Sequence, residues 1–182
     1  ITAIEVTLGT FPDIQKTYGD PDFVLVSPTS NSSAVFRYTS SDTSVATISG
    51  NTVTIVGAGT ATITATQEAT GGYTSASATA LLTVAKANQV LTLNPLPTLL
   101  PLNQFIGTPL LITSSSSSGL GVTITLGSGR PATLSLTTGD YFLTTTLAVG
   151  IVEIIVNQAG DSNYNSAQIS QSFDVTKGNQ TI

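Results

Sequence analysis

The side chains able to do chemistry in this chain are few, and almost all of them are carboxylates. The sequence contains no cysteine, no histidine, no methionine and no tryptophan. This composition excludes cysteine nucleophiles, Cys/His metal sites and the Ser–His–Asp triad. Catalysis would need a pair of carboxylates helped by tyrosine or lysine. The acidic residues are scattered singly, except for Asp20 and Asp22 on either side of Pro21.

Asp20 and Asp22 are the first candidate site. A glycosidase holds two carboxyl groups roughly 5–10 Å apart within a cleft. The rim of a turn has no walls to exclude water, so we expect no catalysis here and no enzymatic activity in the chain. If Asp42 lay nearby in space, a cation bridging strands or domains would be the alternative. Further along, where the sequence repeats itself, Thr108 and Leu110 replace the two aspartates, and we therefore assign no metal.

Asp161 begins the second candidate, the run Asp161–Asn165, which has the D-x-N-x-N opening of a calcium loop. Such a loop also needs glycine at its sixth position and a bidentate glutamate at its twelfth. Ser166 and Ser172 occupy those positions. The prediction is a turn in which Asx side chains bond the backbone, while Tyr164 plugs the end of a folded domain. We expect no cofactor, with Ca²⁺ as the alternative.

Charge and hydropathy exclude two classes of partner. The net charge is −5, and the five basic residues are dispersed, whereas a surface that follows phosphates needs clustered Lys and Arg. No apolar run reaches the ~20 residues of a membrane helix. We therefore expect neither nucleic-acid binding nor membrane insertion of this segment. No basic stretch followed by an apolar core opens the chain, so any export signal is expected outside it.

The elements that must position these residues are β-strands. Threonine, valine and isoleucine dominate and suit a pleated, half-buried surface. Apolar and polar residues alternate along 52–56, 60–66 and 122–126, which is the period of a strand with one buried face. Turn residues recur every 8–12 residues in the first half of the chain. That spacing is typical of a β-sandwich.

An internal repeat divides the chain. The run 84–89 returns as 175–180, and the same offset of 91 residues aligns three further pairs. These pairs are Gln67 with Gln158, Tyr73 with Tyr164, and Gly59 with Gly150. The repeat predicts one domain over 1–86, a second over 87–178, and the start of a third over 179–182. The first and second domains are each about the size of one immunoglobulin-like sandwich. We expect the aligned residues Tyr73, Tyr164, Gly59 and Gly150 to have structural roles.

The expected fold is therefore all-β, with two tandem immunoglobulin-like Greek-key β-sandwich domains arranged end to end. The linker 86–89 has no glycine or proline, so we predict a short, semi-rigid β connection. Gly57–Gly59 is expected to form a tight hairpin in which glycine supplies a positive φ, and Ser114–Ser118 a flexible loop. The predicted strands are 2–8, 23–27, 34–39, 44–48, 52–56, 60–67, 76–85, 89–93, 109–113, 121–126, 133–137, 141–147, 150–157 and 167–176.

The runs 38–53 and 57–63, together with Thr17–Asp20 and Asn163–Asn165, resemble bacterial Ig-like repeats of giant secreted surface adhesins. The likeness is greatest to the arrays of the Bacteroidetes, whose relatives include gliding adhesins exported by type IX secretion. It covers nearly all of the first repeat, while the second diverges over 101–107 and 129–146. The resemblance implies an extracellular, cell-surface location and no enzymatic activity.

The resulting hypothesis is a structural stalk or spacer that holds adhesive regions away from the cell and bears tension. Its partners would be neighbouring repeats of the same chain, with extracellular polysaccharide or another substratum as the alternative. The alternatives are a glycan- or surface-binding module, or an accessory domain of a secreted enzyme. Lys16 and Lys177 raise one further alternative, an intramolecular Lys–Asn crosslink of the kind known in some surface adhesins, although the sequence places no Lys–Asn–acid trio.

Overall fold

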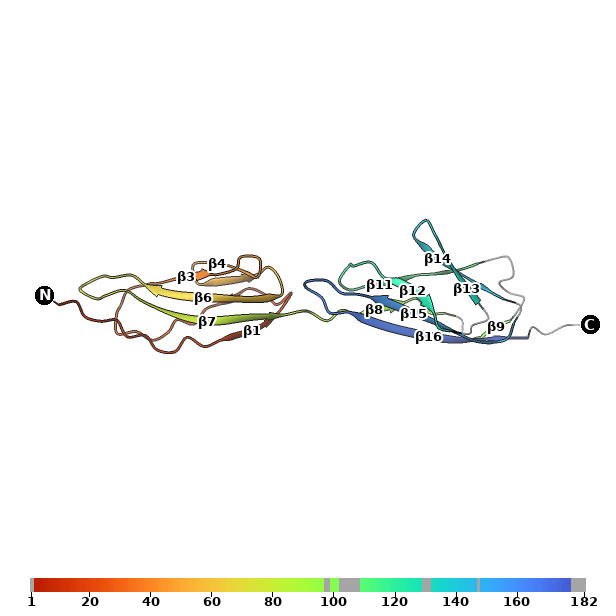
Figure 1. Ribbon diagram of the computed structural model, residues 1–182, viewed down its shortest axis with the longest axis horizontal. Coiled ribbons are helices and arrows are strands. Elements are labelled where there is room, and N and C mark those ends of the chain that lie inside the picture. The colour runs from red at the N-terminus through yellow and green to blue at the C-terminus, as the bar shows by residue number, and fades with distance from the viewer. Residues whose placement is uncertain (1, 97–98, 102–108, 129–131, 147, 178–182) are drawn as a thin grey trace, which may run out of the picture. The chain divides into compact units, whose positions relative to one another are not determined.

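The computed structural model describes residues 2–96, 99–101, 109–128, 132–146 and 148–177, and every regular element in these ranges is a β-strand (Figure 1). No helix that could cross a membrane occurs among them. The chain divides into two compact units. The first unit comprises Ile1–Ala87 with Ser162–Tyr164, and the second comprises Asn88–Asp161 with Asn165–Ile182. The start of a third repeat predicted at 179–182 lies outside the described residues.

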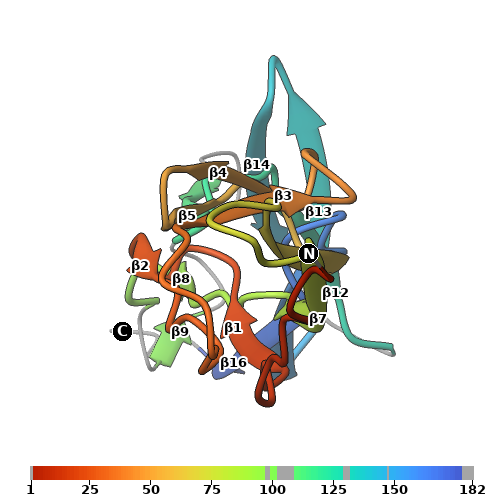
Figure 2. The same cartoon turned by 90° about the vertical axis from the view of Figure 1, so that its left-hand side faces the viewer.

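The first unit is a sandwich of a four-stranded and a three-stranded sheet. The four-stranded sheet has the order β1-β7-β6-β3, and the three-stranded sheet has the order β2-β5-β4. In Figure 2, β4 and β5 lie in one layer and β1 and β7 in the other. The strands are β1 (Ile14–Thr17), β2 (Phe23–Val24), β3 (Phe36–Ser40), β4 (Ala46–Ser49), β5 (Thr52–Ile55), β6 (Gly59–Gln67) and β7 (Ala76–Ala85).

The second unit repeats this topology. Its four-stranded sheet has the order β9-β16-β15-β12, its three-stranded sheet the order β10-β14-β13, and β8 pairs with β11. The strands are β8 (Leu91–Leu93), β9 (Leu99–Pro101), β10 (Leu110–Ile112), β11 (Ser114–Ser116), β12 (Thr123–Leu126), β13 (Ala132–Thr137), β14 (Asp140–Thr145), β15 (Gly150–Gln158) and β16 (Ala167–Thr176). Both units have the immunoglobulin-like arrangement, which confirms the predicted fold class.

Each unit closes its own apolar core. Alternation along β6 buries Ala61, Ile63 and Ala65 and leaves the intervening threonines on the outer face, as a strand with one buried face requires. In the second unit β15 buries Val152 and Ile154 in the same way. The two cores are separate clusters, each built from residues of one unit.

The first and last strands of each four-stranded sheet are adjacent and parallel. In the first unit β1 pairs with β7 from Ile14↔Leu82 to Thr17↔Ala85. In the second unit β9 pairs with β16 from Leu99↔Asp174 to Pro101↔Thr176. In each unit the pair therefore places the strand that begins the four-stranded sheet beside the strand by which the chain leaves the unit.

The structure corrects three of the local predictions. Residues 2–8 form no strand, and make only isolated bridges, Ile4↔Tyr73 and Leu8↔Ser30. The edge strand of this part of the chain is β1, whose four residues were too short a pattern to recognise. Ser114–Ser116 is strand β11 rather than a flexible loop.

The third correction concerns Gly57–Gly59, which does not close a hairpin. The strands on either side of it belong to different sheets, since β5 pairs with β2 and β4 while β6 pairs with β3 and β7. The segment therefore carries the chain from one layer of the sandwich to the other. Gly59 still has the positive φ expected of it, at 149°.

The β13–β14 hairpin is the main difference between the two three-stranded sheets. Six residue pairs join β13 to β14, against four between β4 and β5. The extra pairs are Leu136↔Tyr141 and Thr137↔Asp140, and the tip of the hairpin projects beyond the rest of its unit in both views (Figures 1 and 2).

Candidate functional site

The aspartates singled out as metal candidates serve turns. Asp20 closes the turn after β1, because the Thr17 N–H donates to its Oδ2 at 2.9 Å and its own N–H donates to the Thr17 carbonyl at 3.0 Å. Asp22 is an exposed residue directly before β2. No group of three or more acidic side chains suited to a metal occurs in the described part of the chain, so Asp20, Asp22 and Asp42 do not form one.

Asp42 caps the turn between β3 and β4. Its Oδ1 accepts hydrogen bonds from the Ser44 N–H at 2.9 Å and the Ser44 hydroxyl at 2.6 Å. These two bonds favour the charged carboxylate and hold the pKa of Asp42 below its ordinary value. The carboxylate is fully exposed, so its role is to fix the turn that leads into β4.

Asp161 lies in the connection between β15 and β16, outside both strands and exposed. The three residues that follow it, Ser162–Tyr164, belong to the first unit. In that unit Tyr164 forms a backbone bridge with Ala87, and its ring meets the ring of Tyr18 edge-on at 5.4 Å. The D-x-N-x-N motif thus lies in a bend followed by a bridge residue, and the Ala58 N–H donates to Oδ1 of Asn163 at 2.9 Å.

Tyr73 has a similar backbone setting at the other end of the first unit. It forms a parallel bridge with Ile4, and the N–H of Tyr73 donates to the Thr70 carbonyl at 2.9 Å. The Thr74 N–H donates to the Ile4 carbonyl, also at 2.9 Å. Tyr73 therefore anchors the N-terminal segment that the sequence had suggested was a strand.

Gly59 and Gly150 begin β6 and β15, and both have φ of 149°. A side chain rarely adopts this φ. At Gly59 a Cβ would also stand 2.9 Å from Cγ2 of Val45, a buried core residue. The two glycines thus occupy the same strained backbone position in both units, where the chain has just crossed from one sheet to the other.

Gln67 and Gln158 are the functional residues whose role the sequence did not reveal. They end β6 and β15 and are 1% and 7% exposed. The Oε1 of Gln67 accepts from the Ser30 hydroxyl at 2.5 Å, and its Nε2 donates to the Ala34 carbonyl. The side chain thus fastens the segment before β3 to the end of the four-stranded sheet. The offset of 91 residues marked the two glutamines as equivalent, but an alignment does not show that their side chains are buried.

Gln158 belongs to a larger network in the second unit. Its Oε1 accepts from Nε2 of Gln89 and from the Gly160 N–H. The Oε1 of Gln89 in turn accepts from the hydroxyls of Ser116, at 2.5 Å, and Ser118, at 2.7 Å. The serine-rich run is therefore held by a buried glutamine, which explains why it forms a strand.

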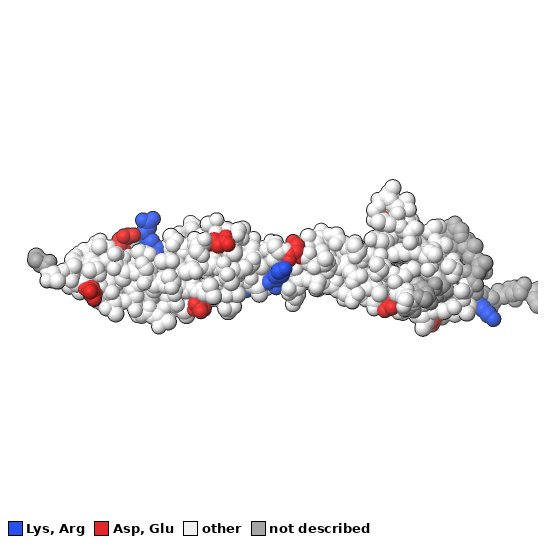
Figure 3. Space-filling view, in the orientation of Figure 1, with Lys and Arg blue, Asp and Glu red and all other residues white. Residues whose placement is uncertain are grey.

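The outer faces of corresponding strands are unrelated in chemistry. Along β6 the outward residues are Thr60, Thr62, Thr64 and Thr66, whereas β15 presents Ile151, Glu153, Ile155 and Asn157 at the same offset. Figure 3 shows that the few charged side chains do not gather into a patch of one sign on the visible face. The two units share an interior and a frame, but they do not share an exposed binding surface on these strands.

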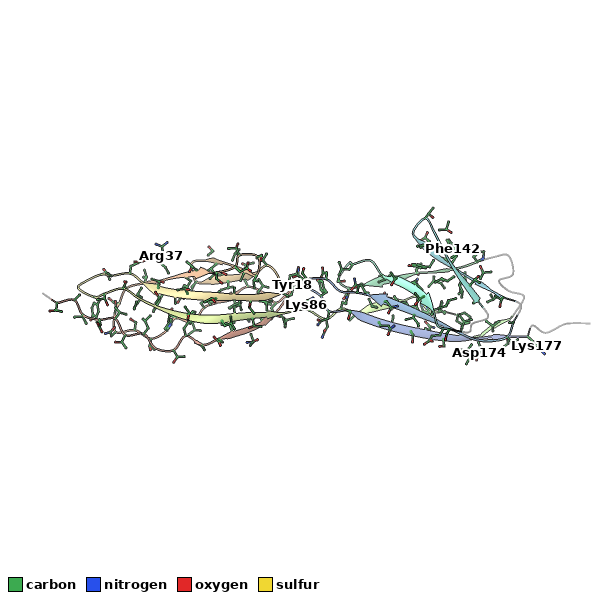
Figure 4. All side chains as sticks on the ribbon, in the orientation of Figure 1. Tyr18, Arg37, Lys86, Phe142, Asp174 and Lys177 are labelled. Atoms are coloured by element: carbon green, nitrogen blue, oxygen red, sulfur yellow. The ribbon has the colours of Figure 1, made fainter. Side chains whose placement is uncertain are left out.

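Lys16 and Lys177, the lysines considered for a crosslink, lie in different units. Lys16 is on β1, with its Nζ 4.5 Å from the centroid of the Phe23 ring, a cation–π contact. Lys177 directly follows β16, at the C-terminal limit of the described residues (Figure 4).

Residues 23–89 match the family model for the bacterial Ig-like domain (group 2). This match runs from β2 to the residues after β7. No curated protein matches the chain.

Several solved structures are similar over most of the chain at low identity. They include protocadherin gammaB7 EC3-6 (13% identity, 96% of this chain and 48% of that chain, TM-score 0.39) and Drosophila N-cadherin EC1-4 (12%, 97% and 50%, TM-score 0.41). A third is a SusE-like surface-located polysaccharide-binding protein from the heparin utilisation locus of Bacteroides thetaiotaomicron (11%, 94% and 34%, TM-score 0.36). The chain spans half or less of each of these structures. Residues 23–89 are thus similar to the bacterial Ig-like domain (group 2), within a chain that folds as two immunoglobulin-like sandwiches.

Proposed function

We propose that this chain is a pair of load-bearing spacer repeats from a bacterial cell-surface adhesin, with no catalytic role of its own. The observation that carries the proposal is the parallel pairing of the first and last strands of the four-stranded sheet in each unit. Tension along the polypeptide pulls such strands in opposite directions along their length. All the hydrogen bonds between them then bear the load together instead of opening one after another.

The details of the β1–β7 pair support this role. Beyond its four paired residues, the Leu81 N–H donates to Oδ1 of Asp13 at 2.7 Å, and the Tyr18 N–H donates to the Ala85 carbonyl at 2.8 Å. The pairing is therefore extended by a hydrogen bond at each end. Leu82 and Val84 on β7 are also buried in the core, so sliding the strands would disturb apolar packing as well.

The residues that the two units share, compared with those that differ, support a structural role over a binding one. The two units have in common the core positions, the positive-φ glycines and the buried glutamines. The outward residues of β6 and β15 differ. A spacer needs only that each copy fold around its own core and join the next. The proposal places the chain outside the cell, with neighbouring repeats as its partners.

The resemblance of the repeat motifs to arrays of the Bacteroidetes extends the proposal to a giant adhesin exported by type IX secretion. This finer assignment rests on the motif runs 38–53 and 57–63 and on the bacterial Ig-like match over 23–89. Its role would be to hold distal adhesive regions away from the cell.

Single-molecule force spectroscopy on the whole chain, pulled from its two ends, tests the proposal. We expect two separate unfolding events, each lengthening the chain by roughly 250 Å, and refolding of both units when the force is released. A single event, or extension without a force peak, would contradict a load-bearing spacer.

A further inference from the structure

The second unit has a hollow of about 310 Å³ beside the turn end of the β13–β14 hairpin. Its floor is apolar, formed by Ile112 and Ile124, which are 3% and 4% exposed. Three separate segments line it, and two of them supply polar side chains, with Thr113 and Ser114 on one side and Tyr141 on the hairpin. An apolar floor with a few converging polar groups is the usual make-up of a small-molecule site, and the volume is at the lower end for such sites.

The longer hairpin supplies the residues that set this hollow apart. Asp140 and Tyr141 belong to the two extra residue pairs of β13 and β14, and both line the hollow. The shorter hairpin of the first unit turns through Gly50 and Asn51 instead, which provide neither an aromatic ring nor a carboxylate. The hollow is thus an addition to the second unit and no part of the shared frame.

Tyr141 is the tyrosine that fits a binding role. Tyr18 and Tyr164 contact each other, and Tyr38 stacks on Phe36 and donates its hydroxyl to Ser27 at 2.6 Å. Tyr73 is built into a turn. Tyr141 is half-buried, packs against the core and lines the hollow.

The chemistry of the walls selects a neutral, hydroxyl-rich ligand. An aromatic ring offers its face to the C–H side of a sugar ring, while the Thr113 and Ser114 hydroxyls can bond sugar hydroxyls. Among the described residues that line the hollow there is no lysine or arginine, and the chain carries a net charge of −5. Uronates and sulfated sugars would therefore be repelled.

We propose that this hollow is a binding subsite for one residue of a neutral polysaccharide. The subsite is additional to the spacer role and does not depend on it. It gives the second unit an activity that the first unit lacks.

Isothermal titration calorimetry of the whole chain tests this proposal. The probes are short soluble oligomers of glucose, mannose and N-acetylglucosamine, with an oligogalacturonate as the acidic comparison. We expect at least one neutral probe to bind with a Kd of about 1 mM or tighter and the acidic probe not to bind. Tyr141→Ala should weaken binding by about tenfold or more, and Ser114→Ala should weaken it by a smaller factor.

Phe142→Ala is the matched control. Phe142, labelled in Figure 4, is the next residue of β14. By strand alternation its side chain lies on the face opposite that of Tyr141. It does not line the hollow, so this variant should retain wild-type affinity. If Tyr141→Ala fails to fold, Tyr141→Leu removes the ring while keeping an apolar side chain. Absence of binding by every neutral probe, preference for the acidic probe, or unchanged affinity in the folded Tyr141 variant would overturn the proposal.

Discussion

Gln67 and Gln158 occupy the same buried position, the last residue of β6 and of β15, in two units whose outward residues on these strands differ. In each case the side-chain oxygen accepts hydrogen bonds from a segment outside the strand, the Ser30 hydroxyl for Gln67 and Nε2 of Gln89 for Gln158. A buried amide without such partners would be costly. The repetition therefore indicates that both units depend on this fastening for stability.

Replacing Gln67 by alanine should destabilise the first unit by about 2–4 kcal/mol, because it leaves a cavity and removes the partner of the Ser30 hydroxyl and the Ala34 carbonyl. Urea unfolding of the whole chain measures the change. Gln15→Ala, at an exposed position of β1, is the control and should change stability by less than about 0.5 kcal/mol. Equal effects of the two variants would show that the hydrogen bonds of Gln67 do not matter.

Gly59→Ala should destabilise the first unit by about 1–3 kcal/mol, since alanine resists the φ of 149° and its Cβ would meet Val45. Gly121→Ala is the matched control in the same chain. Gly121 is not at positive φ and has open space where a Cβ would go, so this variant should be nearly neutral. The pair is compared by thermal unfolding, and a neutral Gly59→Ala would be the unexpected result.

Thr145→Val should stabilise the second unit by about 1 kcal/mol. The hydroxyl of Thr145 is buried and has no hydrogen-bond partner among the described residues, so it bears a desolvation cost that valine, of the same shape, avoids. Thr137→Val, at an exposed position on the neighbouring strand, controls for the change in strand propensity. A loss of stability in Thr145→Val, measured by urea unfolding, would mean that the hydroxyl does have a partner.

The first unit should lose stability in acid through Asp42. Its pKa is lower in the folded protein than in the unfolded chain because Ser44 donates two hydrogen bonds to the carboxylate. Its contribution is therefore fully present above the ordinary aspartate pKa of about 3.9 and is lost as the pH falls through the lower folded value. Urea unfolding at neutral pH should find Asp42→Asn and Ser44→Ala less stable than the wild type, and the differences should shrink in strong acid. A difference independent of pH would contradict this account.

The sequence predicted the fold class for two reasons. A strand with one buried face alternates apolar and polar residues with a period of two, which is clear in 60–66. The repeat offset also showed that the chain contains two copies of one domain. It did not predict β1, since four residues with only one large apolar side chain, Ile14, leave little periodicity. It also missed β11, because serine has low strand propensity and Ser116 is held there by Gln89, a residue distant in sequence.

The candidate sites likewise divide into those that a local sequence pattern could settle and those that depend on contacts between distant segments. Residue types at known spacings were enough to argue that Asp161 lacks the rest of a calcium loop. The buried roles of Gln67 and Gln158, and the hollow beside Tyr141, depend on which segments meet in space. No local pattern in the sequence records that information, even where the repeat marks the residues as equivalent.

The central claim is that the parallel β1–β7 pair bears load, and the direction of pulling tests it most directly. The chain has no cysteine, so engineered cysteines give unique attachment points in the whole protein. Thr10→Cys with Lys86→Cys applies force to the N-terminal end of β1 and the C-terminal end of β7, which shears the pair. Thr10→Cys with Leu81→Cys applies it at the N-terminal end of the paired stretch, because Leu81 is exposed and directly precedes Leu82, and this geometry opens the pair one hydrogen bond at a time. At equal loading rates we predict a severalfold higher unfolding force for the first geometry, and equal forces would contradict the account.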